Sequence, residues 1–251
     1  MTERAINTTK VKLSQSDFQI DAYLAQPTEP GIYPGIIVLQ EIFGVNVHIR
    51  DVTERIAKLG YVAIAPALFQ RQAPGFETGY TPEDIEIGKK YAWSQTTASE
   101  LLSDIQVAIN HLKSLSNTQK SSFGCIGFCF GGHVAYLAAT LPDIQATASF
   151  YGAGITTRTP GGGNPSITRT PEISGTIYTF FGMDDASIPQ EQVDKIETEL
   201  QKHNISHQLF RYDGSDHGFF CDRRGSYNPK AAAAAWEQVQ KLFSQLLITD
   251  Y

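Results

Sequence analysis

The sequence predicts an α/β protein with a mostly parallel, twisted sheet, helices on both faces and an antiparallel hairpin at its N-terminal end. Short apolar or β-branched runs alternate with helical patterns along most of the chain, which is typical of this fold class. The region near residues 10–25 contains only strand-like sequence, which predicts the hairpin. The length of 251 residues, of which 41% are hydrophobic, suffices for one large core, so we expect a single domain over residues 1–251.

Seven segments have the length and residue types of strands. Each is a short run of apolar and β-branched side chains, and most are separated by a helical pattern. In chain order they are Phe18–Leu24, Gly35–Leu39, Tyr61–Ala65, Ser122–Ile126, Ala146–Tyr151, Thr176–Phe181 and His207–Tyr212.

Two helices follow from side-chain spacing. Apolar residues at i, i+3 and i+4 between Leu101 and Leu115 form one helical face, which we expect to cover the sheet. Asn228 and Pro229 have the residue types of an N-cap and a first helical position, and an apolar stripe follows them. Residues 154–175 are dense in Gly, Pro, Ser and Thr and follow neither period, so we expect an irregular loop there.

Charge and cysteine content exclude several classes of function. The chain has 20 Lys and Arg against 26 Asp and Glu, a net charge of −6, which disfavours nucleic acid and anionic membranes as partners. No stretch approaches the roughly 18 apolar residues of a membrane-spanning helix, and we expect a cytoplasmic protein. The three cysteines are odd in number and lack metal-ligand spacing, which argues against a disulfide framework or a structural zinc site.

A nucleophile motif follows one of the predicted strands. Cys129 is the central residue of G-x-C-x-G between Gly127 and Gly131, at the junction of a strand and a helical segment. Such a turn exposes the central side chain and directs it, together with the N–H of Phe130, toward one point. The alternative is a buried structural cysteine beside a glycine-rich turn.

An acid and a base follow later strands in the order that such a nucleophile requires. Asp184 and Asp185 come after the 176–181 strand and compete for the acid role, and His217 comes after the 207–212 strand. Ligands of open α/β sheets bind at the carboxyl ends of strands, where all these residues fall. The other histidines lie on helical or strand patterns, and we expect structural or exposed roles for His48, His111, His133, His203 and His207.

Five separated motifs together resemble the dienelactone hydrolase family (carboxymethylenebutenolidases). They are QEIFGVN at 40–46, RQAPG at 71–75, GFCFGG at 127–132, DASIP at 185–189 and HGF at 217–219. The resemblance spans about residues 10–247 and implies the α/β-hydrolase fold with a Cys-Asp-His triad. It assigns the acid to Asp185 rather than Asp184.

The resemblance also implies further site residues. A second oxyanion donor would be the N–H of Ile42, beside that of Phe130. Glu41 matches an additional acidic residue of the family, which hydrogen-bonds the resting thiol and takes its proton when substrate arrives. Phe43 and Trp93 are candidates for lining an apolar pocket, although large aromatic residues are more often plain core.

The pattern departs from the family where its best-known members hold an anionic lactone with arginines. One of those positions matches Glu86 here, and the other matches Cys221, near but not at Arg223 and Arg224. These two arginines, with Arg158 and Arg169 of the 154–175 loop, are candidate replacements. Cys221 itself is open between pocket lining and packing.

The sequence therefore predicts a hydrolase that cleaves a small ester or lactone through a thioester intermediate on Cys129. Its partner is the small-molecule substrate, and the mechanism implies no metal or organic cofactor because protein groups and water supply all the chemistry. The alternatives are a thiol-based redox-responsive protein and a non-catalytic binding protein on the same fold.

Overall fold

The computed structural model describes residues 3–15 and 18–248. Within them, eight strands form one sheet in the order β1-β2-β4-β3-β5-β6-β7-β8. Strands β3 to β8 run parallel, whereas β1 pairs antiparallel with β2, and β2 pairs antiparallel with β4. The strands are β1 Ile6–Gln15, β2 Phe18–Pro27, β3 Gly35–Leu39, β4 Val62–Pro66, β5 Phe123–Phe128, β6 Ile144–Phe150, β7 Thr176–Gly182 and β8 His207–Tyr212. The predicted fold class is confirmed.

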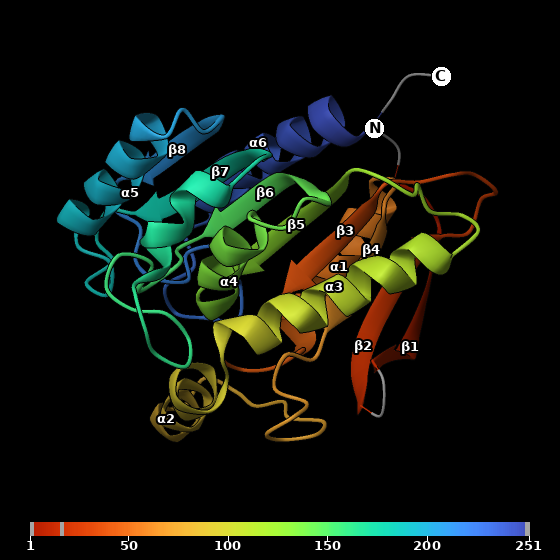
Figure 1. The fold of residues 1–251 in the computed structure, drawn as a ribbon, viewed down its shortest axis with the longest axis horizontal. Helices are drawn as coiled ribbons and strands as arrows, with labels where there is room; N and C mark the ends of the chain where they lie inside the picture. Colours follow the sequence, from red (N-terminus) through yellow and green to blue (C-terminus); the bar gives the residue numbers. More distant parts are fainter. Residues whose placement is uncertain (1–2, 16–17, 249–251) are drawn as a thin grey trace.

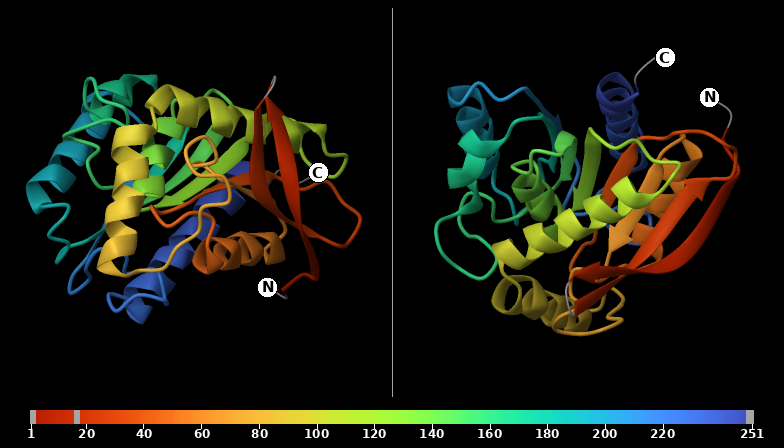
Figure 2. Two further views of the ribbon diagram at one scale, coloured as in Figure 1. Left: turned by 90° about the horizontal axis from the view of Figure 1, so that it is seen from below. Right: turned by 45° about the vertical axis from the view of Figure 1, so that its right-hand side comes forward.

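Helices cover both faces of this sheet, as Figures 1 and 2 show. Helices α3 (Ala98–Ser114) and α4 (Phe130–Ala138) lie on one face, and α1 (Val47–Lys58) and α6 (Pro229–Leu247) on the other. The remaining helical elements are α2 Pro82–Lys90, the π-helical turn η1 Tyr91–Gln95, the 3₁₀-helix η2 Ser166–Glu172 and α5 Gln190–Lys202. None of the helices in the described residues is long and apolar enough to cross a membrane.

The helix ends follow from local sequence. Asn228 caps α6, because its side chain accepts hydrogen bonds from two backbone N–H groups of the first turn, and Pro229 opens the helix as expected. Thr81 and Thr97 cap α2 and α3 with capping boxes, in which the carboxylate three residues later accepts a hydrogen bond from the backbone N–H of the capping threonine.

Two parts of the chain differ from the sequence prediction. Strand β1 is absent from the predicted strands, although the hairpin was expected, because its polar and charged residues give little apolar signal. Within residues 154–175 the structure contains η2, and Ile155, Ile167 and Ile173 are buried there. A single short 3₁₀-helix is too brief to produce a helical period in the sequence. The single domain stays a prediction.

The parallel strands bring distant segments to one edge of the sheet. Strands β3, β5, β7 and β8 run in the same direction, so the loops that follow them emerge on the same side. Residues 40–46, Cys129, Asp185 and His217 follow these four strands, and their neighbourhood is therefore a consequence of topology.

Candidate active site

The backbone at Cys129 makes a sharp strand-to-helix turn. Its φ of 54° and ψ of −114° belong to a region that residues with side chains rarely adopt. A Cβ on Gly127 would collide with the carbonyl oxygen of Gly131, and a Cβ on Gly131 with that of Leu39. Two glycines are thus required for the chain to pass at this turn, as the G-x-C-x-G motif predicts.

Three side chains form a continuous hydrogen-bonded chain above this turn. The Sγ of Cys129 lies 3.0 Å from Nε2 of His217, and Nδ1 of His217 donates to Oδ2 of Asp185 at 2.7 Å. The other carboxylate oxygen of Asp185 accepts the N–H of Ser187 at 2.8 Å, which fixes the carboxylate. Ser187 is a contact that sequence reasoning missed, because a backbone donor carries no residue signature.

The structure separates the two aspartates that the sequence left in competition. Asp185 is buried and directed at His217, whereas Asp184 is exposed. A buried carboxylate in contact with an imidazole orients the ring and stabilises its charge, which an exposed side chain cannot do as effectively.

The charge state of His217 follows from its surroundings. Burial lowers the pKa of His217, but the negative charge of Cys129 and the hydrogen bond from Nδ1 to Asp185 outweigh it and raise the pKa to about 10. His217 is therefore an imidazolium at neutral pH, held between Cys129 and Asp185. Tyr151 packs edge-on against the ring, with centroids 5.2 Å apart.

Glu41 lies beside this chain but does not have the contact predicted for it. The side chain is fully buried, and its Oε1 accepts a hydrogen bond of 3.1 Å from Nη1 of Arg224. The hydrogen-bond partner of the Cys129 sulfur among the described residues is His217, so the expected bond from the resting thiol to Glu41 is absent from this structure. A guanidinium is a charged and stronger donor than a thiol, and it holds one oxygen of the buried carboxylate.

A cleft of about 660 Å³ opens over the sulfur. Its walls include Ile42, Phe43, Trp93, Cys129, His217 and Arg224. The volume is within the usual range for small-molecule sites.

The candidate arginines divide into two groups. Arg224 and Arg158 line the cleft, and the guanidinium of Arg158 lies 4.9 Å from the ring centroid of Trp93. Arg223 is exposed beside Asp222 and is absent from the cleft walls. Arg169 pairs with Glu172 on η2, also off the cleft walls. The residue types in the sequence could not distinguish these four positions.

The two predicted oxyanion donors are backbone groups near the sulfur. Phe130 is the first residue of α4, directly after Cys129, and Ile42 lines the cleft. Neither N–H donates to a turn or loop carbonyl in the part of the chain that the structure describes. Both N–H groups are therefore free to donate a hydrogen bond to an external acceptor.

Comparison with known proteins decides the family. The family model described as "Dienelactone hydrolase family" matches residues 20–247. The chain belongs to this family. The prediction of a hydrolase of this class is confirmed.

Individual relatives agree with that assignment. The chain is 56% identical over 238 residues to a protein of Synechocystis sp. named as a carboxymethylenebutenolidase, covering 95% of this chain and 96% of the relative. It is 30% identical over 218 residues to a Bradyrhizobium protein named as a 2-oxo-3-(5-oxofuran-2-ylidene)propanoate lactonase, covering 86% and 85% of the two chains. A crystal structure from Klebsiella pneumoniae, named as a dienelactone hydrolase, superposes with a TM-score of 0.87 at 28% identity and covers 96% of this chain and all of that one.

The tight turn at Cys129 yields a stability prediction. Gly127→Ala places a methyl group against a backbone carbonyl that cannot rotate away, so we expect the free energy of unfolding to fall by about 3 kcal/mol. Gly225→Ala is the matched control, because a Cβ there meets no atom within 4 Å, and it should change stability by less than about 0.5 kcal/mol. Urea denaturation measures both, and equal effects would contradict the steric argument.

Proposed function

We propose that the protein hydrolyses a small ester or lactone by nucleophilic catalysis at Cys129. The observation that carries this proposal is the chain from Cys129 through His217 to Asp185, with atom separations of 3.0 and 2.7 Å, on the wall of a cleft. A nucleophile, a base and a group that orients the base are the minimum set for acyl transfer.

The reaction proceeds in two halves. The Cys129 thiolate attacks the carbonyl carbon, and the N–H groups of Phe130 and Ile42 stabilise the oxyanion that forms. The His217 imidazolium then gives its proton to the leaving alkoxide as the C–O bond breaks, leaving a thioester and a neutral imidazole. Neutral His217 next takes a proton from water, the hydroxide oxygen attacks the thioester, and the acid product and the thiolate are released.

This arrangement favours catalysis over the redox and binding alternatives. A binding protein gains nothing from holding a sulfur, an imidazole and a buried carboxylate in line, and a redox thiol needs no group that orients its histidine. Asp185 is buried, and its two oxygens bind His217 and the Ser187 N–H. Burying a carboxylate costs desolvation free energy, and a role in orienting the imidazole explains why the protein keeps it there.

The charge of the cleft supports an anionic substrate. Lys89, Arg158 and Arg224 line it against the single carboxylate of Asp216. The name of the Bradyrhizobium relative is that of a lactonase for a propanoate, a carboxylate-bearing lactone. We therefore propose that Arg158 and Arg224 hold the carboxylate of the substrate while its ester carbonyl faces Cys129.

The first test removes the nucleophile. Cys129→Ala should lower kcat/KM for dienelactone by at least about 10³-fold, because only binding and the oxyanion donors remain. Steady-state kinetics with dienelactone and with short-chain aryl esters measures this loss. Cys125→Ala, which changes a buried thiol on β5, is the control and should retain activity. Undiminished turnover in Cys129→Ala would refute the mechanism.

The pH dependence tests the role of His217. Loss of the imidazolium proton removes the acid for the leaving group, so kcat/KM for an alkyl ester should fall as pH rises through about 10. Asp185→Asn removes a group that raises this pKa, and the alkaline fall should therefore move to lower pH. A nitrophenyl ester, whose leaving group needs no proton, is the control and should show a weaker fall. The same alkaline limb in wild type and Asp185→Asn would exclude this assignment.

The cleft charges predict substrate preference. Arg158→Gln should raise KM about tenfold for an anionic ester and leave kcat/KM for an uncharged ester unchanged. Arg169→Gln, in the same 154–175 segment but paired with Glu172, should affect neither substrate. An equal loss for both substrates in Arg158→Gln would mean that Arg158 supports the fold of the cleft rather than an anion.

A further inference from the structure

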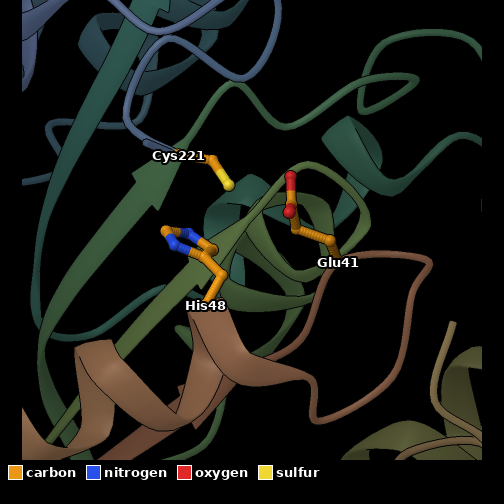
Figure 3. A group of neighbouring side chains, drawn as sticks. All are labelled: Glu41, His48 and Cys221. Carbon is orange, nitrogen blue, oxygen red and sulfur yellow. The ribbon is translucent and has the colours of Figure 1, made fainter. Parts of the chain in front are cut away.

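Three buried side chains outside the proposed relay meet behind the cleft. Glu41 follows β3, His48 lies in the first turn of α1, and Cys221 lies in the loop between β8 and α6. Their candidate ligand atoms all lie within 4.8 Å of one another. Figure 3 shows the Cys221 sulfur directed toward the space between the His48 ring and the Glu41 carboxylate. None of the three residues is more than 2% exposed.

This group contains polar atoms that the protein leaves unpaired. Oε2 of Glu41 and Nε2 of His48 are buried and have no hydrogen-bond partner in the described residues. The Cys221 sulfur lies 3.5 Å from the Tyr80 hydroxyl and is also hydrogen-bonded to the backbone of Arg223. Buried polar groups are normally hydrogen-bonded, so unpaired groups at one point indicate a missing ligand.

We propose that Glu41, His48 and Cys221 bind a divalent transition metal ion of the zinc class. Thiolate, imidazole and carboxylate together suit zinc, whereas calcium and magnesium require oxygen ligands throughout. In a tetrahedral zinc site the ligand atoms lie roughly 3.5 Å from one another. Side-chain rotations that bring the three ligand atoms about 1 Å closer together would therefore form three of the four corners of the tetrahedron. The fourth position is left for water.

The chemistry of binding is balanced within the site. The His48 ring would bind through the lone pair of Nε2, the buried nitrogen that has no hydrogen-bond partner in the described residues. The Cys221 thiol loses its proton to solvent as the sulfur–metal bond forms, and Glu41 binds as a carboxylate. The resulting −2 charge of the ligands balances the ion. A surface cleft lined by Asp51, Asp222 and His48, with Arg55, gives a route to the site.

Metal binding reaches the active site through Glu41. Its Oε1 holds Arg224 at 3.1 Å, and Arg224 lines the cleft that contains Cys129. A cation on Oε2 draws charge away from this ion pair and repels the guanidinium. The consequence, which rests on the function proposed above, is weaker binding of an anionic substrate when metal is present.

The site is tested in a Cys129→Ala background, so that the nucleophile cannot bind the probe. We expect Co²⁺ to give a sulfur-to-cobalt charge-transfer band in Cys129→Ala that disappears in Cys129→Ala/Cys221→Ala. The control Cys129→Ala/Cys125→Ala changes another buried thiol and should keep the band. Absence of the band in Cys129→Ala, or its survival without Cys221, overturns the proposal.

A second measurement does not depend on the folding of the Cys221 variant. Zn²⁺ affinity, from competition with a chromophoric chelator, should fall at least about tenfold in Cys129→Ala/His48→Gln. His111→Gln in the same background changes a histidine on α3 with an unpaired ring nitrogen and should leave affinity unchanged. Equal affinities in the His48 and His111 variants overturn the site.

Kinetics tests the coupling separately. In the wild type, Zn²⁺ should raise KM for an anionic ester more than for an uncharged ester, and His48→Gln should abolish the difference. Equal inhibition of both substrates in the wild type overturns the coupling to Arg224. If neither ester is hydrolysed at all, the proposed function fails, while the cobalt spectrum still reports on the metal site.

Discussion

The strained turn at Cys129 is the constraint on which the rest of the site depends. Its positive φ is held in place because the backbone around Gly127, Gly131 and Gly132 packs against neighbouring carbonyl oxygens with no room for a Cβ. The sulfur therefore sits at a fixed point above the sheet. The loops after β7 and β8 have only to bring Asp185 and His217 to that point, and parallel strand order ensures that both loops emerge on the same side.

The buried charges around this point are arranged as separate pairs. Asp185 is directed at His217, and Glu41 at Arg224, with both carboxylate side chains 1% exposed or less. An unpaired carboxylate at such burial would be strongly destabilising, so each one requires its own cation. This division leaves the imidazolium entirely to Cys129 and Asp185.

The sequence predicted those features of the structure that depend on residues close together in the chain. The alternation of strands and helices, the Asn228 cap with Pro229 at the start of α6, and the glycines of the Cys129 turn are all set by neighbouring residues, and the structure has them. Contacts between distant segments were not predictable in this way. The Glu41–Arg224 pair joins residues 183 positions apart, and nothing in either segment specifies the other. The same limit hid the meeting of His48 with Cys221, because metal-ligand spacing is a local signal.

Glu41 can respond to charge only through its side chain, since its backbone is clamped. A Cβ on Gly88 of α2 would collide with the carbonyl oxygen of Ile42, and one on Gly44 with that of Phe76. This close packing against the backbone of Ile42 and Gly44 holds residues 41–44 at a fixed position, and the N–H of Ile42 with them. In the proposed mechanism, a change in what the Glu41 carboxylate binds therefore moves Arg224 while leaving the proposed oxyanion donor in place. On the proposed function, substrate binding and carbonyl activation would be separately adjustable, although Glu41 and Ile42 are adjacent in the chain.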